Sequence, residues 1–348
     1  MCRTHGHKIR RRKLANPKKI LNDPKKVVAE MLEGLVFAND GRLRKLDKHA
    51  AIVRTDLPES KVALLIGGGS GHEPIFHGFV GKNMGDGAAC GQVFAAPSPD
   101  IIVEAAKAVH RGKGVLFLYG NYAGDNMNFD MASEILTEDE GIEVRTVRVT
   151  DDVAAAPPER MHDRRGVAGD LYAIKIAGGA ATECDTLDEV ERIARKAVAN
   201  LRSIGIAVAA GSIPETGKLT FELADDEIEI GMGAHGEAGV SRQKIAPADT
   251  VADQIMEKLL SDLPFKRGDE VALLINNLGA TTMMEMLIVN RRIRQILDRE
   301  GIKVHRTDVG TWLTVQEMAG FSVTLLRLDD ELKHYLDLPA ESLGYSRM

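Results

Sequence analysis

The sequence predicts an α/β fold of two α/β domains, with mainly parallel or mixed sheets that are flanked by helices. The chain has 348 residues, a length typical of about two domains. Short apolar runs such as Val62–Ile66 and Glu270–Ile275 have the length of buried strands. Helical segments alternate with these runs, and this order favours parallel strands that are joined by right-handed crossovers.

We expect the chain to divide after residues 17 and 184. Residues 1–17 are rich in arginine and lysine, and we interpret them as a basic, disordered extension. A nucleic-acid-binding or targeting arm is the alternative interpretation of this segment. Residues 18–184 are expected to form an N-terminal α/β domain that carries a glycine-rich loop. Residues 185–348 are expected to form a C-terminal α/β domain that carries a candidate ligand-binding histidine.

Apolar spacing and helix-start signals define the expected elements of the first domain. Ser98-Pro99-Asp100 is a typical helix start. The expected elements are helix 24–37, strand 62–66, helix 101–110, strand 114–118, helix 128–136, strand 144–149 and helix 167–181. Two charged stretches, Asp151–Val153 and Arg164–Gly166, precede the last helix. Judged by their composition alone, they would be solvated surface.

The second domain is expected to follow a linker at residues 182–187. Its expected elements are helix 188–204, strand 205–210, short strands 221–223 and 228–230, helix 248–260, strand 270–275, helix 282–299, strand 303–309 and strand 321–328. The segment Asn276–Thr281 could be mistaken for a dinucleotide loop, but it lacks the third glycine of that fingerprint.

The composition excludes several classes of protein. A net charge of -6 gives no general affinity for nucleic acid or membranes. The three cysteines are widely spaced, so they form neither a disulfide framework nor a metal-ligand pattern, and a reducing cytoplasm fits. No apolar run approaches the roughly 18 residues of a membrane-spanning helix. The N-terminus also lacks the apolar core of a secretory signal.

The stretch KVALLIGGGSGHEP, residues 61–74, is the first candidate site. A buried strand opens into Gly67–Gly69, and such bare backbone at the carboxyl end of a strand is where open α/β sheets bind ligands. Ser70 and His72 add a hydroxyl and an imidazole. No Lys-Ser or Lys-Thr follows, and the G-x-G-x-x-G spacing fails, so neither a P-loop nor a dinucleotide fingerprint is present. A tight strand-to-helix turn without a ligand is the alternative.

Two further residues are candidates for chemistry. Asp125 follows the strand at 114–118, and it would face the same cleft as His72 if their strands are neighbours. Helix capping is the alternative role for this aspartate. His235 lies between glycines, which leave room for a small ligand at its ring. A turn histidine that bonds to backbone is the alternative there.

Three separated motifs, GGGSGHEP, NY-x-GD and GxHGE-x-G, occur in this order. Together they resemble the dihydroxyacetone kinase family, in its ketone-binding (K) subunit, over about residues 18–338. The resemblance implies that His235 forms a covalent hemiaminal with the carbonyl of a short-chain hydroxyketone. Asp125 would then accept the proton of the attacking primary hydroxyl, and His72 would act as acid and base on the carbonyl oxygen. The backbone amides of Gly68 and Gly69, with Ser70, would bind substrate hydroxyls.

The sequence departs from the family at one position of the expected site. The family commonly has a lysine just before NY-x-GD that contacts dihydroxyacetone, whereas this chain has Gly120. Glycine provides neither the charge nor the volume of lysine, so we expect a larger pocket. The expected substrate is dihydroxyacetone or a four-carbon ketose such as erythrulose, and the wider pocket favours the second.

The resemblance also implies partners. The chain has no motif for a nucleotide or Mg²⁺, and in the family a helical (L) subunit or domain carries both. We expect this chain to bind no cofactor and to end too early for a fused domain. It would form a homodimer and work with a partner that carries ATP, or ADP rephosphorylated by a phosphotransferase system. The alternatives are a catalytically silent, ketone-sensing co-regulator of transcription and, less favoured, an unrelated carbonyl enzyme such as an isomerase.

Overall fold

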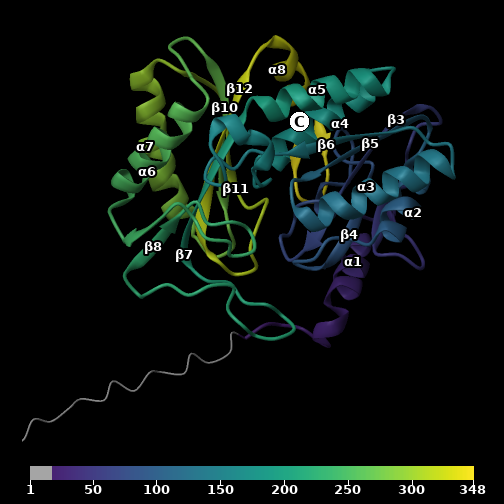
Figure 1. Cartoon of the computed structure of the whole chain (residues 1–348), viewed down its shortest axis with the longest axis horizontal. Coiled ribbons are helices and arrows are strands. Elements are labelled where there is room, and N and C mark those ends of the chain that lie inside the picture. Colours follow the sequence, from purple (N-terminus) through teal and green to yellow (C-terminus); the bar gives the residue numbers. More distant parts are fainter. Residues whose placement is uncertain (1–17) are drawn as a thin grey trace, which may run out of the picture.

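The computed structural model describes residues 18–348, which form two large sheets with helices on their faces (Figure 1). Strands between residues 43 and 149 build the first sheet, and strands between residues 201 and 328 build the second. The predicted α/β fold class is therefore confirmed. The predicted basic extension, residues 1–17, lies outside the described residues. Between residues 18 and 348, no helix has both the length and the apolar composition that crossing a membrane requires.

The first sheet has six strands in the order β1-β2-β4-β3-β5-β6. Their bounds are Leu43–Lys45 (β1), Ala51–Arg54 (β2), Lys61–Ser70 (β3), Gly87–Val93 (β4), Gly112–Gly120 (β5) and Val144–Val149 (β6). The neighbours from β4 to β6 run parallel, as predicted, whereas β1 and β2 extend one edge antiparallel. Because parallel strands end at the same edge of a sheet, β3 and β5 bring the residues that follow them to one place.

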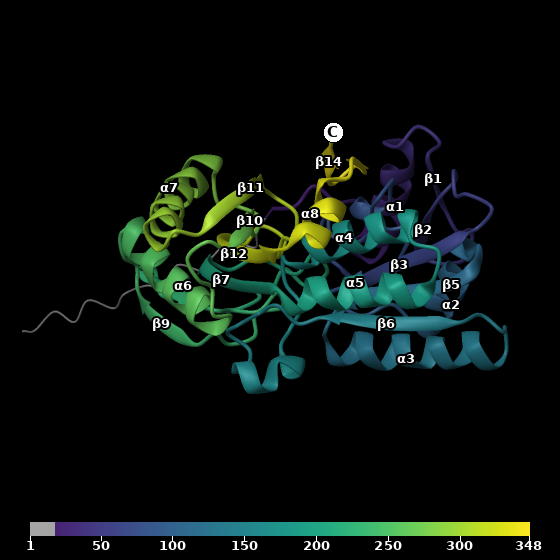
Figure 2. The same ribbon diagram turned by 90° about the horizontal axis from the view of Figure 1, so that it is seen from above.

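Helices cover both faces of the first sheet, and Figure 2 shows α3 lying along β6. The helices of this part of the chain are α1 (Val27–Phe37), α2 (Pro99–Val109), α3 (Ala123–Glu138), α4 (Asp170–Glu183) and α5 (Leu187–Ala199). Along β3, Ala63 and Leu65 join the core with α2 and α3, while Leu64 and Ile66 join the core with α4 and α5. The strand is apolar throughout because both of its faces are buried.

The second sheet has six strands in the order β11-β10-β12-β7-β8-β9. Their bounds are Leu201–Ala209 (β7), Glu227–Ile230 (β8), Ser241–Lys244 (β9), Glu270–Asn277 (β10), Lys303–Gly310 (β11) and Ala319–Leu328 (β12). Strands β10 and β11 run parallel, and the other neighbouring pairs run antiparallel. The sheet is therefore mixed, which the prediction allowed.

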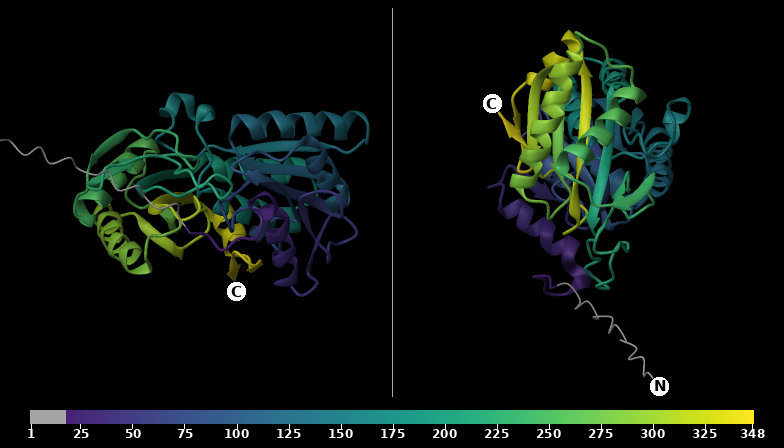
Figure 3. Two further views of the ribbon diagram at one scale, coloured as in Figure 1. Left: turned by 90° about the horizontal axis from the view of Figure 1, so that it is seen from below. Right: turned by 90° about the vertical axis from the view of Figure 1, so that its left-hand side faces the viewer.

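The two sheets share one apolar core. Helices α6 (Ala248–Asp262) and α7 (Met283–Glu300) cover one face of the second sheet, where Leu273 lies in their core. On the opposite face, Leu274 and Leu326 belong to the core that contains Leu64 and Ile66 of the first sheet and also the apolar residues of α4. Figure 3 shows the two sheets side by side in two further views. Each sheet thus supports the other across the junction.

The remaining elements are short. They are the 3-10 helices Pro24–Lys26, His77–Phe79 and Pro158–Asp163, helix α8 (Asp330–Asp337), and the strand pair β13 (Ala340–Glu341) and β14 (Ser346–Arg347). The predicted domain boundary after residue 184 falls between α4 and α5. Helix α5 packs against α4 and against β5 and β6 of the first sheet. The boundary itself stays a prediction.

The predicted elements differ from the structure in several places after residue 184, and α8, β13 and β14 were not predicted at all. The helix predicted over 188–204 ends at Ala199, and β7 begins at Leu201. Apolar residues at 197, 201 and 204 continue a helical spacing, but Leu201 and Ile204 are instead buried in a strand. Residues 221–223 form no strand, whereas the strand predicted at 228–230 is confirmed as part of β8. Strand β9 (SRQK) escaped prediction because its residues are polar and largely exposed.

The charged stretches before α4 are buried, so their prediction as solvated surface is wrong. The carboxylate of Asp151 accepts hydrogen bonds from the backbone N–H groups of Val167 at 2.8 Å and Gly169 at 2.9 Å. The fully buried guanidinium of Arg164 donates twice to Asp262 on α6, at 2.9 and 2.5 Å. These charges are buried because each has a partner inside the protein. The loop therefore connects the two units.

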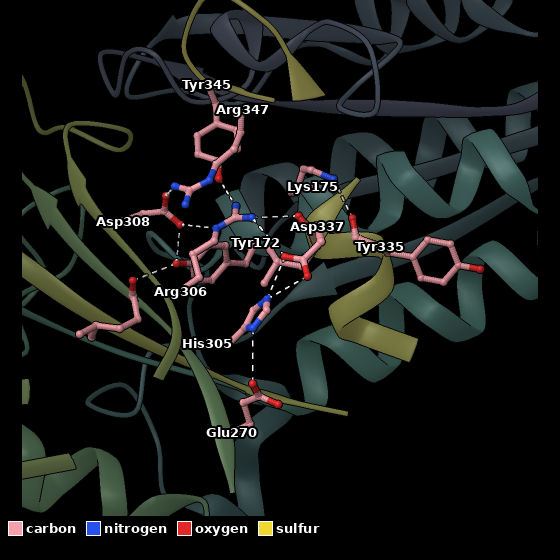
Figure 4. A network of polar contacts seen from close by, with 12 residues as sticks. Tyr172, Lys175, Glu270, His305, Arg306, Asp308, Tyr335, Asp337, Tyr345 and Arg347 are labelled. Atoms are coloured by element: carbon pink, nitrogen blue, oxygen red, sulfur yellow. Dashed lines mark hydrogen bonds and ion pairs between the residues drawn. The ribbon is translucent and has the colours of Figure 1, made fainter. Parts of the chain in front are cut away.

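A polar network also joins α4 to the second sheet (Figure 4). The Tyr172 hydroxyl donates to Asp308 at 2.9 Å, and the Arg306 guanidinium donates to the same carboxylate at 3.0 Å. Lys175 is fully buried and donates to the Tyr335 carbonyl oxygen at 2.7 Å, and burial lowers its pKa to about 7. Because Tyr172 and Lys175 lie on α4 while Arg306 and Asp308 lie on β11, the network holds the two units in one arrangement.

Candidate functional site

A small cavity lies where the carboxyl ends of β3 and β5 meet the 231–239 segment of the second unit. Its lining residues are Gly67, Gly68, Gly69, His72, Ile75, Phe76, Gly120, Tyr122, Asp125, Gly166, Asp170, Ala234, His235 and Leu313. Since β3 and β5 are neighbours, His72 and Asp125 face one cavity, as the strand order predicted. His235 reaches the same cavity from the other unit.

The glycines at this site lie in a strand, which corrects the prediction of a loop after residue 66. Strand β3 continues to Ser70, and its glycines pair with β4, Gly67 opposite Ala89. They let other groups approach closely, because a Cβ on Gly67 would lie 2.6 Å from the Ala89 carbonyl oxygen. Ser70 donates its hydroxyl proton to the Gly91 carbonyl oxygen at 2.7 Å and does not line the cavity. Its hydroxyl therefore fixes the strand end.

We predict that Gly68→Ala destabilises the protein by about 1–3 kcal/mol, the usual cost of overpacking a buried position. The new Cβ would overlap the ring of Phe76, which forms part of the cavity wall. Denaturant unfolding of both proteins would measure the difference in the free energy of unfolding. Gly34→Ala is the control, because that helical glycine has open space around it and alanine favours a helix. Equal stability of Gly68→Ala and the unmodified chain would contradict the packing argument.

The sequence predicted that Asp125 lies in a loop, but it lies in the first turn of α3. It is 9% exposed, and its Oδ1 atom has no hydrogen-bond partner among the described residues. Burial raises its pKa to about 7, although the nearby His235 and a backbone N–H oppose the shift. No side chain caps this helix, so the alternative of a capping aspartate finds no support. The carboxyl group is available to a ligand in the cavity.

His72 is held as a neutral ring with a defined tautomer. Its Nδ1 donates to the backbone carbonyl oxygen of Thr314 at 2.8 Å, because a carbonyl oxygen can only accept. Burial, assisted by the charge of His235, lowers the pKa of His72 to about 3 against the opposing effect of the Thr314 bond. At neutral pH its Nε2 therefore has no proton, and its lone pair is available at the cavity wall.

Glu237 contacts His235 at two points, the ring and the backbone N–H. Its Nδ1 lies 3.2 Å from Glu237 Oε1, and its backbone N–H donates to Glu237 Oε2 at 2.9 Å. Burial acts to raise the pKa of Glu237, but the bonds from His235 outweigh it and lower that pKa to about 2. Glu237 is thus a carboxylate, and the His235 Nδ1 carries the proton between them. The alternative of a histidine that bonds only backbone does not hold.

The two histidines face each other across the cavity. Their Nε2 atoms lie 3.1 Å apart, and their rings meet edge to face with centroids 4.9 Å apart. Phe94 and Tyr122 also present ring edges or faces to His235, with centroids 5.7 and 4.8 Å away. Since both Nδ1 protons are used elsewhere, the Nε2 contact is a hydrogen bond only when one further proton lies between the two nitrogens.

Several site residues were not singled out from the sequence. Glu237 and Tyr122 belong to quoted motifs, whereas Thr314 and Asp170 carried no local signal. Arg165 lies near Glu237, with 3.9 Å between Nη1 and Oε2, and is itself held by the buried Asp152 at 2.7 Å. Over residues 18–348, no group of three or more His, Cys, Asp or Glu side chains is arranged to hold a metal ion.

Solved structures with this architecture define the class of the protein. The crystal structure of the dihydroxyacetone kinase from C. freundii in complex with AMP-PNP and Mg²⁺ has a TM-score of 0.87 and 31% identity, and the match covers 94% of this chain and 61% of that chain. The dihydroxyacetone kinase operon co-activator Dha-DhaQ has a TM-score of 0.86 and 32% identity, with 93% and 99% covered.

The chain belongs to the Dak1 family, whose Dak1 domain model matches residues 33–344. It is 46% identical over 327 residues to PTS-dependent dihydroxyacetone kinase 2, dihydroxyacetone-binding subunit DhaK, of Listeria innocua. That match covers 93% of this chain and 98% of the Listeria protein. It is also 40% identical over 334 residues to L-erythrulose 1-kinase of Mycolicibacterium smegmatis. This second match covers 94% of this chain and 58% of the kinase. The predicted resemblance to a family of ketose kinases is confirmed.

Proposed function

We propose that this chain is the substrate-binding subunit of a ketose kinase of the dihydroxyacetone type. It would hold a short-chain hydroxyketone as a hemiaminal on His235 and present the primary hydroxyl of that ketone for phosphoryl transfer. The observation that carries the proposal is the 3.1 Å contact between the Nε2 atoms of His72 and His235 in a cavity that also contains Asp125. Such an arrangement supplies a nucleophile, a proton carrier and a base around one small cavity.

In this proposal one further proton is shared between the two Nε2 atoms, and it moves to His72 as His235 Nε2 attacks the carbonyl. His235 Nε2 forms the new bond to the carbonyl carbon, the π electrons of the carbonyl move to its oxygen, and that oxygen takes the proton through His72 Nε2. The substituted His235 ring then carries a positive charge. Glu237, a carboxylate 3.2 Å from Nδ1, balances that charge before and after the step. The reverse sequence releases the ketone.

Asp125 is the candidate base for phosphoryl transfer. Its pKa of about 7 lies near neutral pH, where a general base combines an adequate ionised fraction with adequate basicity. Its unpaired Oδ1 can accept the hydroxyl proton as that oxygen attacks phosphorus. The phosphoryl group would come from a nucleotide with Mg²⁺ on a partner. The ketone could not be replaced by a polyol, since a polyol has no electrophilic carbon for His235.

The names of the relatives support a multi-component system. One relative is called a PTS-dependent dihydroxyacetone-binding subunit, and a solved neighbour is a dihydroxyacetone kinase with AMP-PNP and Mg²⁺. We infer a helical, nucleotide-binding subunit as the partner, with ADP rephosphorylated by a phosphotransferase system or with ATP. We also infer a homodimer of this chain. No nucleic acid or membrane takes part in this proposal.

A ketone-sensing co-regulator is the second candidate function. The structure of the co-activator Dha-DhaQ is 32% identical and nearly the same length as this chain. A sensor needs the covalent attachment but not the base, so His235 alone would suffice. The presence of Asp125, with a free oxygen in the cavity and a pKa of about 7, favours the kinase.

A reconstitution separates the two functions. We predict that the chain alone does not phosphorylate ketones, and that adding a purified helical nucleotide-binding subunit of a dihydroxyacetone kinase, with ATP or a rephosphorylating system, produces ketose phosphate. Product would be measured by phosphorus NMR with dihydroxyacetone, erythrulose and glycerol as acceptors. Ketone binding without phosphorylation under every donor would support the sensor and contradict the kinase. Phosphorylation of glycerol at the same rate would contradict attachment through a carbonyl.

A further inference from the structure

Asp170 is a buried carboxyl group in the cavity that the proposed mechanism does not use. It lies in the first turn of α4, is 2% exposed and lines the cavity beside Gly120 and Gly166. Its Oδ1 atom has no hydrogen-bond partner among the described residues. A buried carboxyl oxygen without a partner is costly to the folded protein, so its position requires an explanation.

The neighbouring acid Asp151 provides the comparison. Asp151 is fully buried too, but each of its carboxylate oxygens accepts a backbone N–H, from Val167 and from Gly169. That aspartate has a structural role at the start of α4. Asp170 is the first residue of α4 and directly follows Gly169, but its own carboxyl group makes no such bond. The fold therefore does not need the carboxyl group of Asp170 for capping.

The surroundings of Asp170 favour its protonated, uncharged form. Burial raises its pKa well above the ordinary range, and the nearby carboxyl groups of Asp151 and Asp125 raise it further. A neutral carboxylic acid can donate one hydrogen bond and accept others. A hydroxyl group of an uncharged ligand can do the same, so the two groups are complementary in both directions.

Gly120 opens the space in front of this acid. A Cβ on Gly120 would lie 3.2 Å from Asp170 Oδ2 and 3.4 Å from the Gly166 Cα atom. Any longer side chain at position 120 would therefore extend along the same wall as Asp170. The backbone of Gly120 lies outside the left-handed region, so its conformation would accept a side chain. Without a side chain at position 120, the cavity reaches the carboxyl group of Asp170.

We propose that Asp170 binds the hydroxyl group at the non-reacting end of a ketose longer than three carbons, and so determines substrate specificity. This inference rests on the proposed function, because it extends the substrate that His235 would hold. The ketone carbonyl would lie at the two histidines and one primary hydroxyl at Asp125. The additional hydroxymethyl group would lie in the space that Gly120 leaves open.

A binding cycle on the chain alone tests this role. The ligands are erythrulose, its 4-deoxy analogue in which a methyl group replaces the terminal hydroxymethyl group, and dihydroxyacetone. Each is labelled with carbon-13 at the carbonyl carbon, so that NMR distinguishes free ketone from tetrahedral adduct during titration. The proteins are the unmodified chain, Asp170→Ala and Asp170→Asn.

The unmodified chain is expected to bind erythrulose about tenfold more tightly than the deoxy analogue, the effect of one well-placed hydrogen bond. Asp170→Ala should reduce this ratio below about twofold while dihydroxyacetone affinity changes less than about threefold. Asp170→Asn should keep most of the ratio, because an amide also donates and accepts. It also keeps the test decisive if the alanine variant fails to fold.

An unchanged ratio in Asp170→Ala, or a lost ratio in Asp170→Asn with intact dihydroxyacetone binding, would overturn the role of Asp170 and leave the proposed function standing. Failure of the unmodified chain to form an adduct with any of the ketones would overturn the proposed function itself. Gly120→Lys supplies an independent arm, since the lysine would fill the open space and contact Asp170. It is expected to weaken erythrulose binding at least about tenfold more than dihydroxyacetone binding.

Discussion

Replacing His235 with alanine is expected to abolish adduct formation and to lower kcat/KM for ketones by a factor on the order of 10²–10⁴, the range for removing a positioned group at a reacting centre. A hydroxyketone of three or four carbons has few atoms, and its non-covalent affinity is correspondingly limited. In the proposed mechanism, a covalent bond to Nε2 would therefore be the main source of both the binding energy and the discrimination between ketones and polyols. Carbonyl carbon-13 NMR of the chain with labelled ketone, together with coupled kinetics, measures both effects.

Glu237→Gln is the matched control for this variant. It keeps a side chain of the same shape next to His235 Nδ1 but removes the negative charge that balances the substituted ring. We expect the adduct to persist with weaker affinity. The ratio of ketone to glycerol turnover should fall in His235→Ala and remain high in the control. An undiminished adduct in His235→Ala would assign the attachment to another residue and refute the mechanism.

Replacing Asp125 with asparagine is expected to lower kcat by a factor on the order of 10²–10⁴, because the hydroxyl that attacks phosphorus loses its base. Ketone attachment should remain, since the two histidines and Glu237 are unchanged. The expected result is thus full adduct formation without turnover. Loss of both the adduct and turnover would show that Asp125 supports the structure of the cavity and not the transfer step.

The same aspartate predicts a pH dependence. With a pKa of about 7, Asp125 is protonated below that pH and cannot accept a proton, so kcat/KM should fall about tenfold for each unit of pH below 7. It should level off above that value. Burial lowers the pKa of His72 to about 3, so its titration as a separate group lies below this range. A flat profile from pH 5 to 8 in the unmodified system would contradict the assignment of Asp125 as base.

The sequence predicted the parts of this protein that depend on local pattern. The apolar runs predicted β3 and β5 as strands and placed His72 and Asp125 in one cleft on the condition that these strands are neighbours, which the structure shows. The glycines around His235 marked a position with room for a ligand. Strand and helix lengths were less predictable, since β3 continues through its glycines by pairing with β4.

Other parts depend on contacts between residues far apart in the chain. Thr314, which sets the tautomer of His72, lies 242 positions away and belongs to no motif. The burial of Arg164 depends on Asp262, 98 positions later, so composition alone suggested solvated surface. Asp170 follows a run of small residues without any sign of its role. Its position in the cavity is evident only in the folded protein, where Gly120 and Gly166 lie beside it without side chains.

The hydrogen bond from His72 to Thr314 joins segments that are made at different times during synthesis of the chain. Synthesis proceeds from the N-terminus, and the first sheet can fold before residue 314 leaves the ribosome. Until then His72 has no acceptor for its Nδ1 proton and no His235 opposite its Nε2. The proposed ketone site is therefore complete only after the segment around Thr314 has been synthesised and has packed against His72.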